Sequence, residues 1–289
     1  MFFCGKSDIG KVRTTNQDSY LSARLYDNVL LCVVCDGMGG ANGGNIASAL
    51  AIKVFADTVR RGLSDRKQAV STDGTLLLPA AGREDDLTGL LLTAAKRANT
   101  AVYDRSGEDE TLSGMGTTLI AVLIANDILY ALHIGDSRLY QITKTGLKRL
   151  TRDHSYVQYL VDIGEMTEEE AENASIRNII TRSVGTEYDV TPDVYRDRLR
   201  GEGYLLLCTD GLTNYVSEDE ILETVTAPCV ISEITDTDYE LEDKTDRLIE
   251  LANRGGGGDN ITAILIKYDF TPEQKKSEVP DASPSGSDA

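Results

Sequence analysis

Four aspartates stand where apolar runs of the chain begin or end. The runs are Val29 to Cys35, Ile128 to Ile134, Tyr204 to Thr209 and Ile261 to Ile266, and the aspartates are Asp36, Asp136, Asp210 and Asp259. Continuous aliphatic runs of this length predict buried strands, so each carboxylate lies at a strand end. Packed sheets bring strand ends together, and clustered carboxylates repel one another strongly unless a cation lies between them. Oxygen ligands without imidazole or thiolate indicate Mg²⁺ or Mn²⁺.

A simpler interpretation is that these aspartates only form turns, because Asp-Gly and Asp-Asn are common turn dipeptides. The neighbouring residues favour chemistry instead. Asp36 opens the run DGMGG, which is richer in glycine than a hairpin needs and lets the backbone approach a ligand closely. The segment from Arg13 to Asp18 adds a guanidinium and a fifth carboxylate.

Seven short strings occur in an order and at a spacing typical of one catalytic domain. They are RTTNQD at 13–18, DGMGG at 36–40, SGMGTT at 113–118, GDSR at 135–138, TRDHS at 151–155, TDGL at 209–212 and GDNIT at 258–262. Each string alone is weak, but the ordered set is highly specific. Over about residues 5–268 the chain resembles the metal-dependent protein phosphatases of the PPM family, type 2C, in their compact bacterial form.

The resemblance implies that the chain hydrolyses phosphoserine and phosphothreonine in proteins and so reverses Ser/Thr kinase signalling. In this family a water that bridges two divalent ions, Mg²⁺ or Mn²⁺, attacks the phosphate. By the resemblance, Asp36 contacts both ions and the Gly37 carbonyl contacts one of them. Asp210 and Asp259 complete the shell of the other ion.

Three further residues receive roles from the same resemblance. Arg13 matches the phosphate-binding arginine, and its alternative is a surface ion pair in this acidic chain. Asp18 is the expected acceptor for a metal-bound water, one shell out from the ions. Asp136 matches a ligand of a possible third ion shared with Asp210, and its alternative is an acceptor for backbone N–H groups in a turn.

The chain departs from the family where many members carry a histidine that could protonate the leaving alkoxide. Met38 and Ala41 occupy those positions. The only histidines are His133, inside an apolar run, and His154, which we expect to be structural at the base of a flap. Protonation of the leaving group is then expected from metal-bound water, or it is weak.

Two other functions share the same scaffold. A pseudophosphatase would bind phosphopeptides or regulators without turnover, but the presence of Asp36, Asp210 and Asp259 favours an enzyme. A third interpretation keeps the chemistry and replaces the phosphoprotein by a small phosphoester.

Composition limits the partners. The formal net charge of −18 disfavours nucleic acid and anionic membranes, which would repel the chain. No apolar stretch is long enough to span a membrane, and residues 1–10 lack the pattern of a signal peptide, so we expect a cytoplasmic protein. We also expect a monomer. Five cysteines predict reduced thiols. Cys32 and Cys35 should point to opposite faces of one strand rather than form a C-x-x-C site.

Periodicity predicts an α+β fold. Expected helices cover 44–61, 85–103 and 240–253, a capping box at Ser217 opens another helix, and strands 117–125 and 128–134 meet at Asn126-Asp127. The family resemblance sharpens this to a four-layer α/β/β/α sandwich, with two packed antiparallel sheets flanked by helices.

We expect one catalytic domain over 1–269 and a disordered tail over 270–289, where Pro, Ser and charged residues dominate. Two short helices, 155–163 and 167–173, are expected within 151–185. By resemblance this segment is a flap that gates substrate access, and by composition alone it is a polar helical hairpin.

Overall fold

Two five-stranded antiparallel sheets form the centre of the molecule. In this computed structural model, residues 1–65, 71, 73–75, 85–228 and 237–271 are described. One sheet has the order β1-β12-β11-β8-β9, and the other has the order β10-β7-β6-β3-β2. The first sheet contains β1 (Phe2–Asp8), β8 (Arg138–Thr143), β9 (Gly146–Arg149), β11 (Gly201–Cys208) and β12 (Ile261–Phe270). The second contains β2 (Ser19–Tyr26), β3 (Val29–Cys35), β6 (Leu119–Ala125), β7 (Ile128–Ile134) and β10 (Asp193–Arg198).

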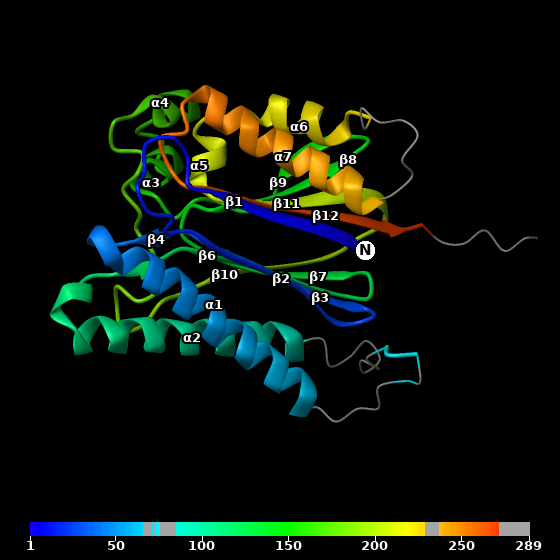
Figure 1. The fold of residues 1–289 in the computed structure, drawn as a ribbon, viewed down its shortest axis with the longest axis horizontal. Helices are drawn as coiled ribbons and strands as arrows, with labels where there is room; N and C mark the ends of the chain where they lie inside the picture. Colours follow the sequence, from blue (N-terminus) through cyan, green and yellow to red (C-terminus); the bar gives the residue numbers. More distant parts are fainter. Residues whose placement is uncertain (66–70, 72, 76–84, 229–236, 272–289) are drawn as a thin grey trace, which may run out of the picture.

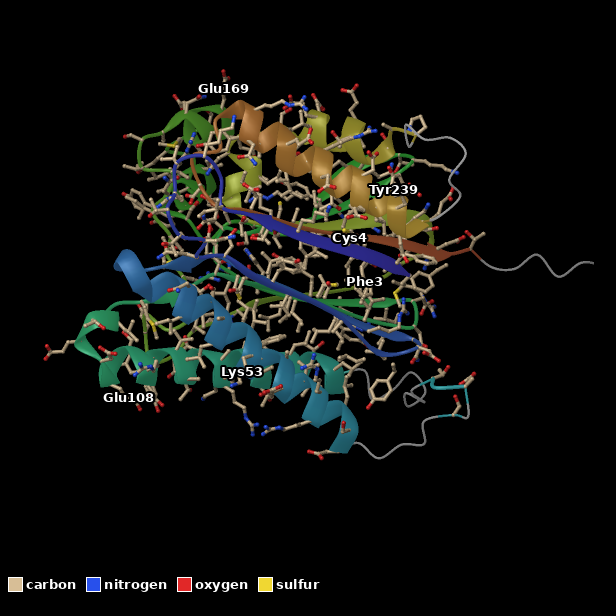
Figure 2. The ribbon with its side chains drawn as sticks, viewed as in Figure 1. Phe3, Cys4, Lys53, Glu108, Glu169 and Tyr239 are labelled. Carbon is tan, nitrogen blue, oxygen red and sulfur yellow. The ribbon has the colours of Figure 1, made fainter. Side chains whose placement is uncertain are left out.

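Helices cover the outer face of each sheet, so the chain has the expected four layers (Figure 1). The helices α1 (Gly40–Asp65) and α2 (Asp85–Glu108) pack on the sheet that contains β3. On the other sheet lie α5 (Asp210–Thr213), α6 (Glu218–Thr226) and α7 (Thr237–Gly255). Side chains fill the space between the layers (Figure 2). The α+β sandwich is therefore confirmed.

The position of β3 between the two layers that cover it explains why its sequence is apolar throughout. Leu30, Cys32 and Val34 face the core between the two sheets, whereas Val33 and Cys35 face α1 and α2. Both faces of the strand are buried, which removes the usual alternation of polar and apolar residues. The two cysteines lie on opposite faces, as predicted.

Local sequence signals predicted some helix starts correctly and others not. The Ser217 hydroxyl accepts a hydrogen bond from the Glu220 backbone amide, and the Glu220 carboxylate accepts one from the Ser217 backbone amide. These two bonds confirm the capping box of α6. The helix α1 begins at Gly40, before the expected start at Gly44, because packing against the loop that follows β3 overrides the low helix propensity of glycine. Each of the two helices α3 (Tyr156–Asp162) and α4 (Glu168–Asn173) falls within its predicted range.

The first and last strands of the described fold pair with each other. β1 runs antiparallel to β12, from Phe2 opposite Lys267 to Asp8 opposite Ile261. Phe270 was expected to begin the tail, but it is the last residue of β12 and pairs with Gly201. The rest of the predicted tail, 272–289, lies outside the described residues. None of the helices in the described ranges is long and apolar enough to cross a lipid bilayer.

Candidate metal centre

The loops that carry the predicted ligands emerge at one end of the sandwich, where β4 (Gly37–Met38), α5 and α3 lie together (Figure 1). Asp36 follows β3, Gly135 and Asp136 follow β7, and Asp210 follows β11 after one intervening residue. Asp259 precedes β12, which runs antiparallel to β11, so its start lies beside the end of β11. The antiparallel register thus places these acids together.

Asn260 ties the N-terminal loop to this end of the sheet. Its Oδ1 accepts from the Gln17 backbone amide at 2.8 Å, and its Nδ2 donates to the carbonyl oxygens of Ile9 and Thr15 at 3.0 and 3.1 Å. The side chain is buried. One amide group therefore fixes the loop that carries Arg13 against the start of β12.

The backbone around Asp36 is held on both sides. The Asp36 carbonyl accepts from the Thr118 amide and the Thr117 hydroxyl, each at 2.8 Å, and the Asp36 amide donates to the Thr118 hydroxyl at 2.9 Å. A side chain on Gly37 would put its Cβ 2.0 Å from the Gly44 carbonyl oxygen, and one on Gly211 would lie 1.9 Å from that of Asn260. Both positions require glycine because backbone occupies the space.

Burial and mutual repulsion raise the pKa of the clustered carboxyls. The pKa of Asp36 is raised well above its usual value by burial first and then by Asp18, Asp210, Asp136 and Asp259. Burial and the nearby Asp210 raise the pKa of Asp136 in the same way. For Asp210, burial and Asp259 raise the pKa, while a hydrogen-bond interaction with Asp36 and the bond donated by Asn214 oppose the shift. The five predicted acids therefore share one electrostatic site.

The carboxylate oxygens in this site fit hard divalent cations. On each of Asp18, Asp136 and Asp210, Oδ1 is buried and has no hydrogen-bond partner in the described part of the chain. Such oxygens are costly to bury unless a proton or a cation satisfies them. Within the described residues, no three His, Cys, Asp or Glu side chains lie in an arrangement that could by itself hold a metal ion. Ions such as Mg²⁺ retain several waters and bind only one or two protein carboxylates. A site in which each of several acids offers one unpartnered oxygen fits this kind of coordination.

Asp18 is buried and is held by two threonines. Its Oδ2 accepts from the hydroxyl of Thr262 at 2.7 Å and from that of Thr209 at 3.0 Å. Burial raises the pKa of Asp18 to about 7, and repulsion from Asp210 adds to this, although the two hydroxyl bonds favour the charged form. Because Oδ2 is already occupied, Oδ1 is the atom left to accept from a water.

Arg13 lies at the exposed rim of the cluster and pairs with Asp259. Its Nη2 donates to Asp259 Oδ2 at 2.8 Å, and half of the side chain is exposed. Asp36 and Asp210 also stabilise the guanidinium charge, which raises the pKa of Arg13 further. The expected alternative, an ion pair, is thus present, but its partner is itself a predicted metal ligand.

His154 anchors the loop that carries Asp136. The Gly135 amide donates to His154 Nδ1 at 3.1 Å, and the His154 amide donates to the Gly135 carbonyl oxygen at 2.8 Å. Its Nε2 lies 3.1 Å from Arg182 Nη1 and 3.3 Å from Asp193 Oδ2. With both ring nitrogens engaged and little of the ring exposed, His154 is structural, as expected.

His133 is the second histidine near this loop, and it lies wholly inside the core. Its ring packs on the ring of His154 with centroids 4.7 Å apart. Burial, followed by repulsion from His154, lowers the pKa of His133 to about 3. A histidine in this environment is neutral and does not act as a proton donor at neutral pH.

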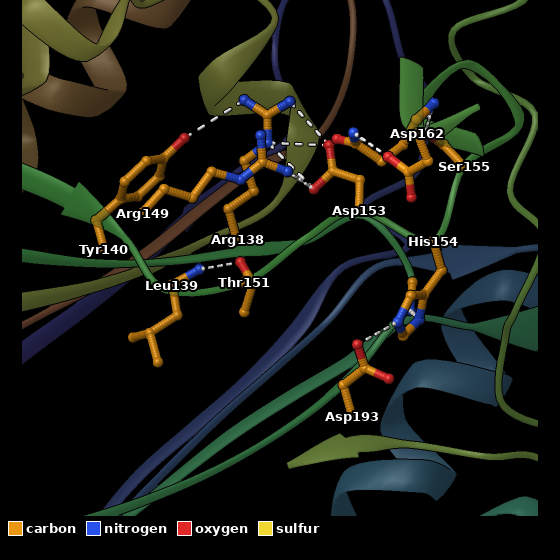
Figure 3. A network of polar contacts seen from close by, with 12 residues as sticks. Arg138, Leu139, Tyr140, Arg149, Thr151, Asp153, His154, Ser155, Asp162 and Asp193 are labelled. Carbon is orange, nitrogen blue, oxygen red and sulfur yellow. Dashed lines mark hydrogen bonds and ion pairs between the residues drawn. The ribbon is translucent and has the colours of Figure 1, made fainter. Parts of the chain in front are cut away.

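Asp153 forms a charged network beside His154 (Figure 3). Arg138 Nη2 and Nε donate to Asp153 Oδ2 at 2.8 and 3.1 Å, and Arg149 pairs with Oδ1. The GDSR and TRDHS strings thus bond to each other through their charged residues as well as through His154. Sequence reasoning gave no role to Asp153 or Arg138.

Several other supporting residues were also missed. The threonines that bond Asp18, the threonines that hold Asp36 and the central Asn260 received no role from the sequence. The available signal was their membership of the strings TDGL, SGMGTT and GDNIT. Spacing alone does not show hydrogen bonds between segments that are distant in the chain.

Comparisons with known proteins identify the family. A family model described as Protein phosphatase 2C matches residues 4–243. The serine/threonine phosphatase stp of Listeria monocytogenes is 33% identical over 266 residues, which cover 92% of this chain and 95% of that protein. The serine/threonine protein phosphatase PstP of Mycobacterium tuberculosis is 35% identical over 94% of this chain, which spans only 46% of that relative.

A solved structure shows the same fold with metal bound. The catalytic domain of serine threonine protein phosphatase PstP, in complex with two manganese ions, superimposes with a TM-score of 0.71 at 33% identity. The match covers 92% of this chain and 98% of that one. The chain therefore belongs to the protein phosphatase 2C family, and the resemblance seen in its motifs is confirmed.

Proposed function

We propose that this chain is a metal-dependent phosphatase that removes phosphate from phosphoserine and phosphothreonine in proteins. The observation that carries the proposal is the cluster of buried carboxylates with unpartnered oxygens, edged by Arg13. Membership of the family and the two manganese ions in the related structure support it. Two Mg²⁺ or Mn²⁺ ions would supply an acidified bridging water as nucleophile and would neutralise charge on the transferring phosphoryl group.

The residues of the chain divide the work of binding. Asp36 and the Gly37 carbonyl would hold the ions from the β3 side, and Asp210 and Asp259 would hold them from the other sheet. Asp136 would join Asp210 at a third ion, and Asp18 would accept a hydrogen bond from a water. Arg13 would exchange its bond to Asp259 for the phosphate oxygens, which its planar fork can hold in pairs.

No histidine of the described site is placed to protonate the leaving group, because His133 is in the core and both nitrogens of His154 are engaged. The proton would therefore come from water at the cluster. A serine or threonine alkoxide, which needs the proton, should leave more slowly than an aryl oxide.

We also propose the setting in which the enzyme acts. Its partners would be phosphorylated proteins and the Ser/Thr kinase system that modifies them, in the cytoplasm, with the protein acting as a monomer. The segment 151–185 would serve as a flap beside the site, because His154 at its base bonds Gly135, the neighbour of Asp136.

The test is metal-dependent turnover of an aryl phosphate. Purified protein should hydrolyse p-nitrophenyl phosphate with Mn²⁺ or Mg²⁺ and stop in EDTA. Asp36→Asn should abolish turnover because it removes a ligand of both ions, whereas Glu108→Gln on the exposed end of α2 should have no effect. Activity of Asp36→Asn that persists in EDTA would refute the two-ion assignment.

A further inference from the structure

Two buried hydroxyl groups connect the loop that carries Asp36 to the loop that carries Asp136. The Oγ1 of Thr118 lies 2.7 Å from the Oγ of Ser137, and neither side chain is exposed to solvent. The same Thr118 oxygen accepts from the Asp36 amide at 2.9 Å. A continuous hydrogen-bonded path therefore runs from the backbone of Asp36 to the residue that follows Asp136. We call the two hydroxyls of Thr118 and Ser137 the hydroxyl bridge.

The topology of the sheet places Thr118 between the two loops. Strand β6 lies between β3 and β7 in the sheet, and it is antiparallel to both. The start of β6 therefore lies beside the ends of its two neighbours, which lead into Asp36 and Asp136. Thr118 directly precedes β6, so its side chain is placed to contact both loops.

The Thr118 side chain also packs against the Asp136 loop. A Cβ added at Gly135 would lie 2.6 Å from Thr118 Cγ2 and 2.7 Å from Thr118 Cβ, so this glycine rests directly on the threonine. The φ of Gly135 is +109°, a conformation that other residues rarely adopt. Thr118 therefore supports the turn before Asp136 with its methyl group and bonds the residue after Asp136 with its hydroxyl.

The hydroxyl of Thr118 is explained by its hydrogen bonds rather than by packing. Valine has nearly the same shape as threonine, and it carries no polar group that costs free energy when it is buried. A hydroxyl has one proton and two lone pairs, so Thr118 can accept from the Asp36 amide and bond Ser137 at the same time. Buried hydrogen bonds that are linked in this way strengthen one another. The bridge therefore ties the position of the Asp136 loop to that of Asp36.

We propose that the hydroxyl bridge is a positioning pair that sets the affinity of the ion bound by Asp136. This inference rests on the proposed phosphatase function, in which Asp36 binds the two core ions and Asp136 joins Asp210 at a third. The bridge holds the loops of Asp36 and Asp136 in one relative position, so the third ion meets a preformed site. Removing groups that orient metal ligands typically lowers metal affinity by about 10- to 100-fold.

The test measures Mn²⁺ binding directly, by isothermal titration calorimetry and by electron paramagnetic resonance of the free ion. Asp136→Ala should remove one ion from the titration, which identifies the ion concerned. Ser137→Ala breaks the bridge and leaves the bond between Thr118 and the Asp36 amide intact. It should weaken that same ion by about tenfold and leave the tighter ions within about twofold of wild type. Thr118→Val also removes the acceptor of the Asp36 amide, so it should weaken the tighter ions as well.

Two further variants separate the hydroxyl from packing and from stability. Thr118→Ser keeps the hydroxyl and loses the methyl group that packs on Gly135. It should bind Mn²⁺ like wild type, while its free energy of urea unfolding falls. Thr245→Val is the matched control, because Thr245 is also fully buried and its hydroxyl donates to the Leu241 carbonyl oxygen within α7 at 2.7 Å. This control should lose stability without a change in Mn²⁺ affinity.

A double variant and a rate measurement test whether the two hydroxyls act together. Thr118→Val combined with Ser137→Ala should bind the ion at Asp136 no more weakly than Thr118→Val alone, because the first substitution already breaks the bridge. Turnover of p-nitrophenyl phosphate by Ser137→Ala should recover when the Mn²⁺ concentration is raised about tenfold, since only affinity is lost.

The outcomes that contradict the inference differ from those that contradict the proposed function. Wild type that binds no Mn²⁺ or hydrolyses no phosphate ester contradicts the proposed function. Active wild type from which Asp136→Ala removes no ion contradicts the positioning role, and so does Ser137→Ala with every Mn²⁺ affinity unchanged or with all of them weakened equally. Thr118→Ser that binds Mn²⁺ as weakly as Thr118→Val would show that the methyl group, and not the hydroxyl, positions the loop.

Discussion

Asp18 should make the metal-free protein more stable in mild acid, and Asp18→Asn should remove this effect. Burial raises the pKa of the folded-state carboxyl to about 7, above its unfolded value of 3.8. Between these values the folded protein holds a proton that the unfolded chain has released. The contribution of Asp18 to the free energy of unfolding is therefore present at low pH and is lost as the pH rises through 7.

The size of the effect follows from the shift. Below the folded pKa, each pH unit adds about 1.36 kcal/mol to the free energy of unfolding. Because Asp18 is half titrated at pH 7, lowering the pH from 7 to 5 adds about 2 kcal/mol to the free energy of unfolding. His133 acts in the opposite direction, because its pKa is lowered to about 3 and its contribution is lost as the pH falls below about 6.5. The difference between wild type and Asp18→Asn cancels the contribution of His133.

The assay is urea unfolding at pH 5, 6 and 7, in EDTA and with excess Mn²⁺. In EDTA, wild type should gain about 2 kcal/mol more than Asp18→Asn between pH 7 and pH 5. The amide of the variant still offers an oxygen to Thr209 and Thr262, so the substitution removes the charge while keeping both hydroxyl hydrogen bonds. Mn²⁺ should flatten the wild-type dependence, because the cation replaces the proton in neutralising the cluster. Equal pH dependence of the two proteins in EDTA would refute the electrostatic account of the site.

Three further substitutions test other parts of the structure. Asp136→Ala should keep the fold and two bound metal ions, counted by elemental analysis, and should lose turnover. An unfolded variant would favour the turn role of Asp136, and full activity would show that a third ion is not needed. Asp153→Asn should lower the free energy of urea unfolding by about 3 kcal/mol, because it breaks the partly buried pairs with Arg138 and Arg149, and a loss under 1 kcal/mol would contradict this. Ser217→Ala should cost about 1 kcal/mol in the same assay, with Ser175→Ala, in the exposed stretch after α4, as an unaffected comparison.

The sequence predicted the parts of the fold that depend on local pattern. Runs such as Val29 to Cys35 are apolar on both faces, so they could only be buried strands, and the acids at their ends followed directly. The Ser217 capping box marked the start of α6 correctly because both partners lie within one turn, and the structure shows the same kind of box at Thr167, before α4. Strand β10 carried no such signal, since its Asp and Arg residues are partly or fully exposed at the edge of a sheet.

The sequence predicted which acids gather at one end of the sandwich, but it did not predict the residues that support them. Motif strings identified Asp36, Asp136, Asp210 and Asp259, and the structure places them in one cluster with raised pKa values for the first three. The role of Asn260 could not be predicted, because its three hydrogen bonds reach residues more than 240 positions away. Contacts of that kind depend on the completed topology rather than on local sequence.

The pairing of β1 with β12 also determines when the site can form during synthesis. Asp18 belongs to the first loop and Asp259 precedes the last strand, so the carboxylate cluster spans almost the whole folded chain. A ribosome must release β12 from its exit tunnel before Asn260 can capture the N-terminal loop. Contacts this remote in sequence form late and slowly. Nascent chains should therefore acquire the helical layer of α1 and α2 well before they acquire a competent metal site.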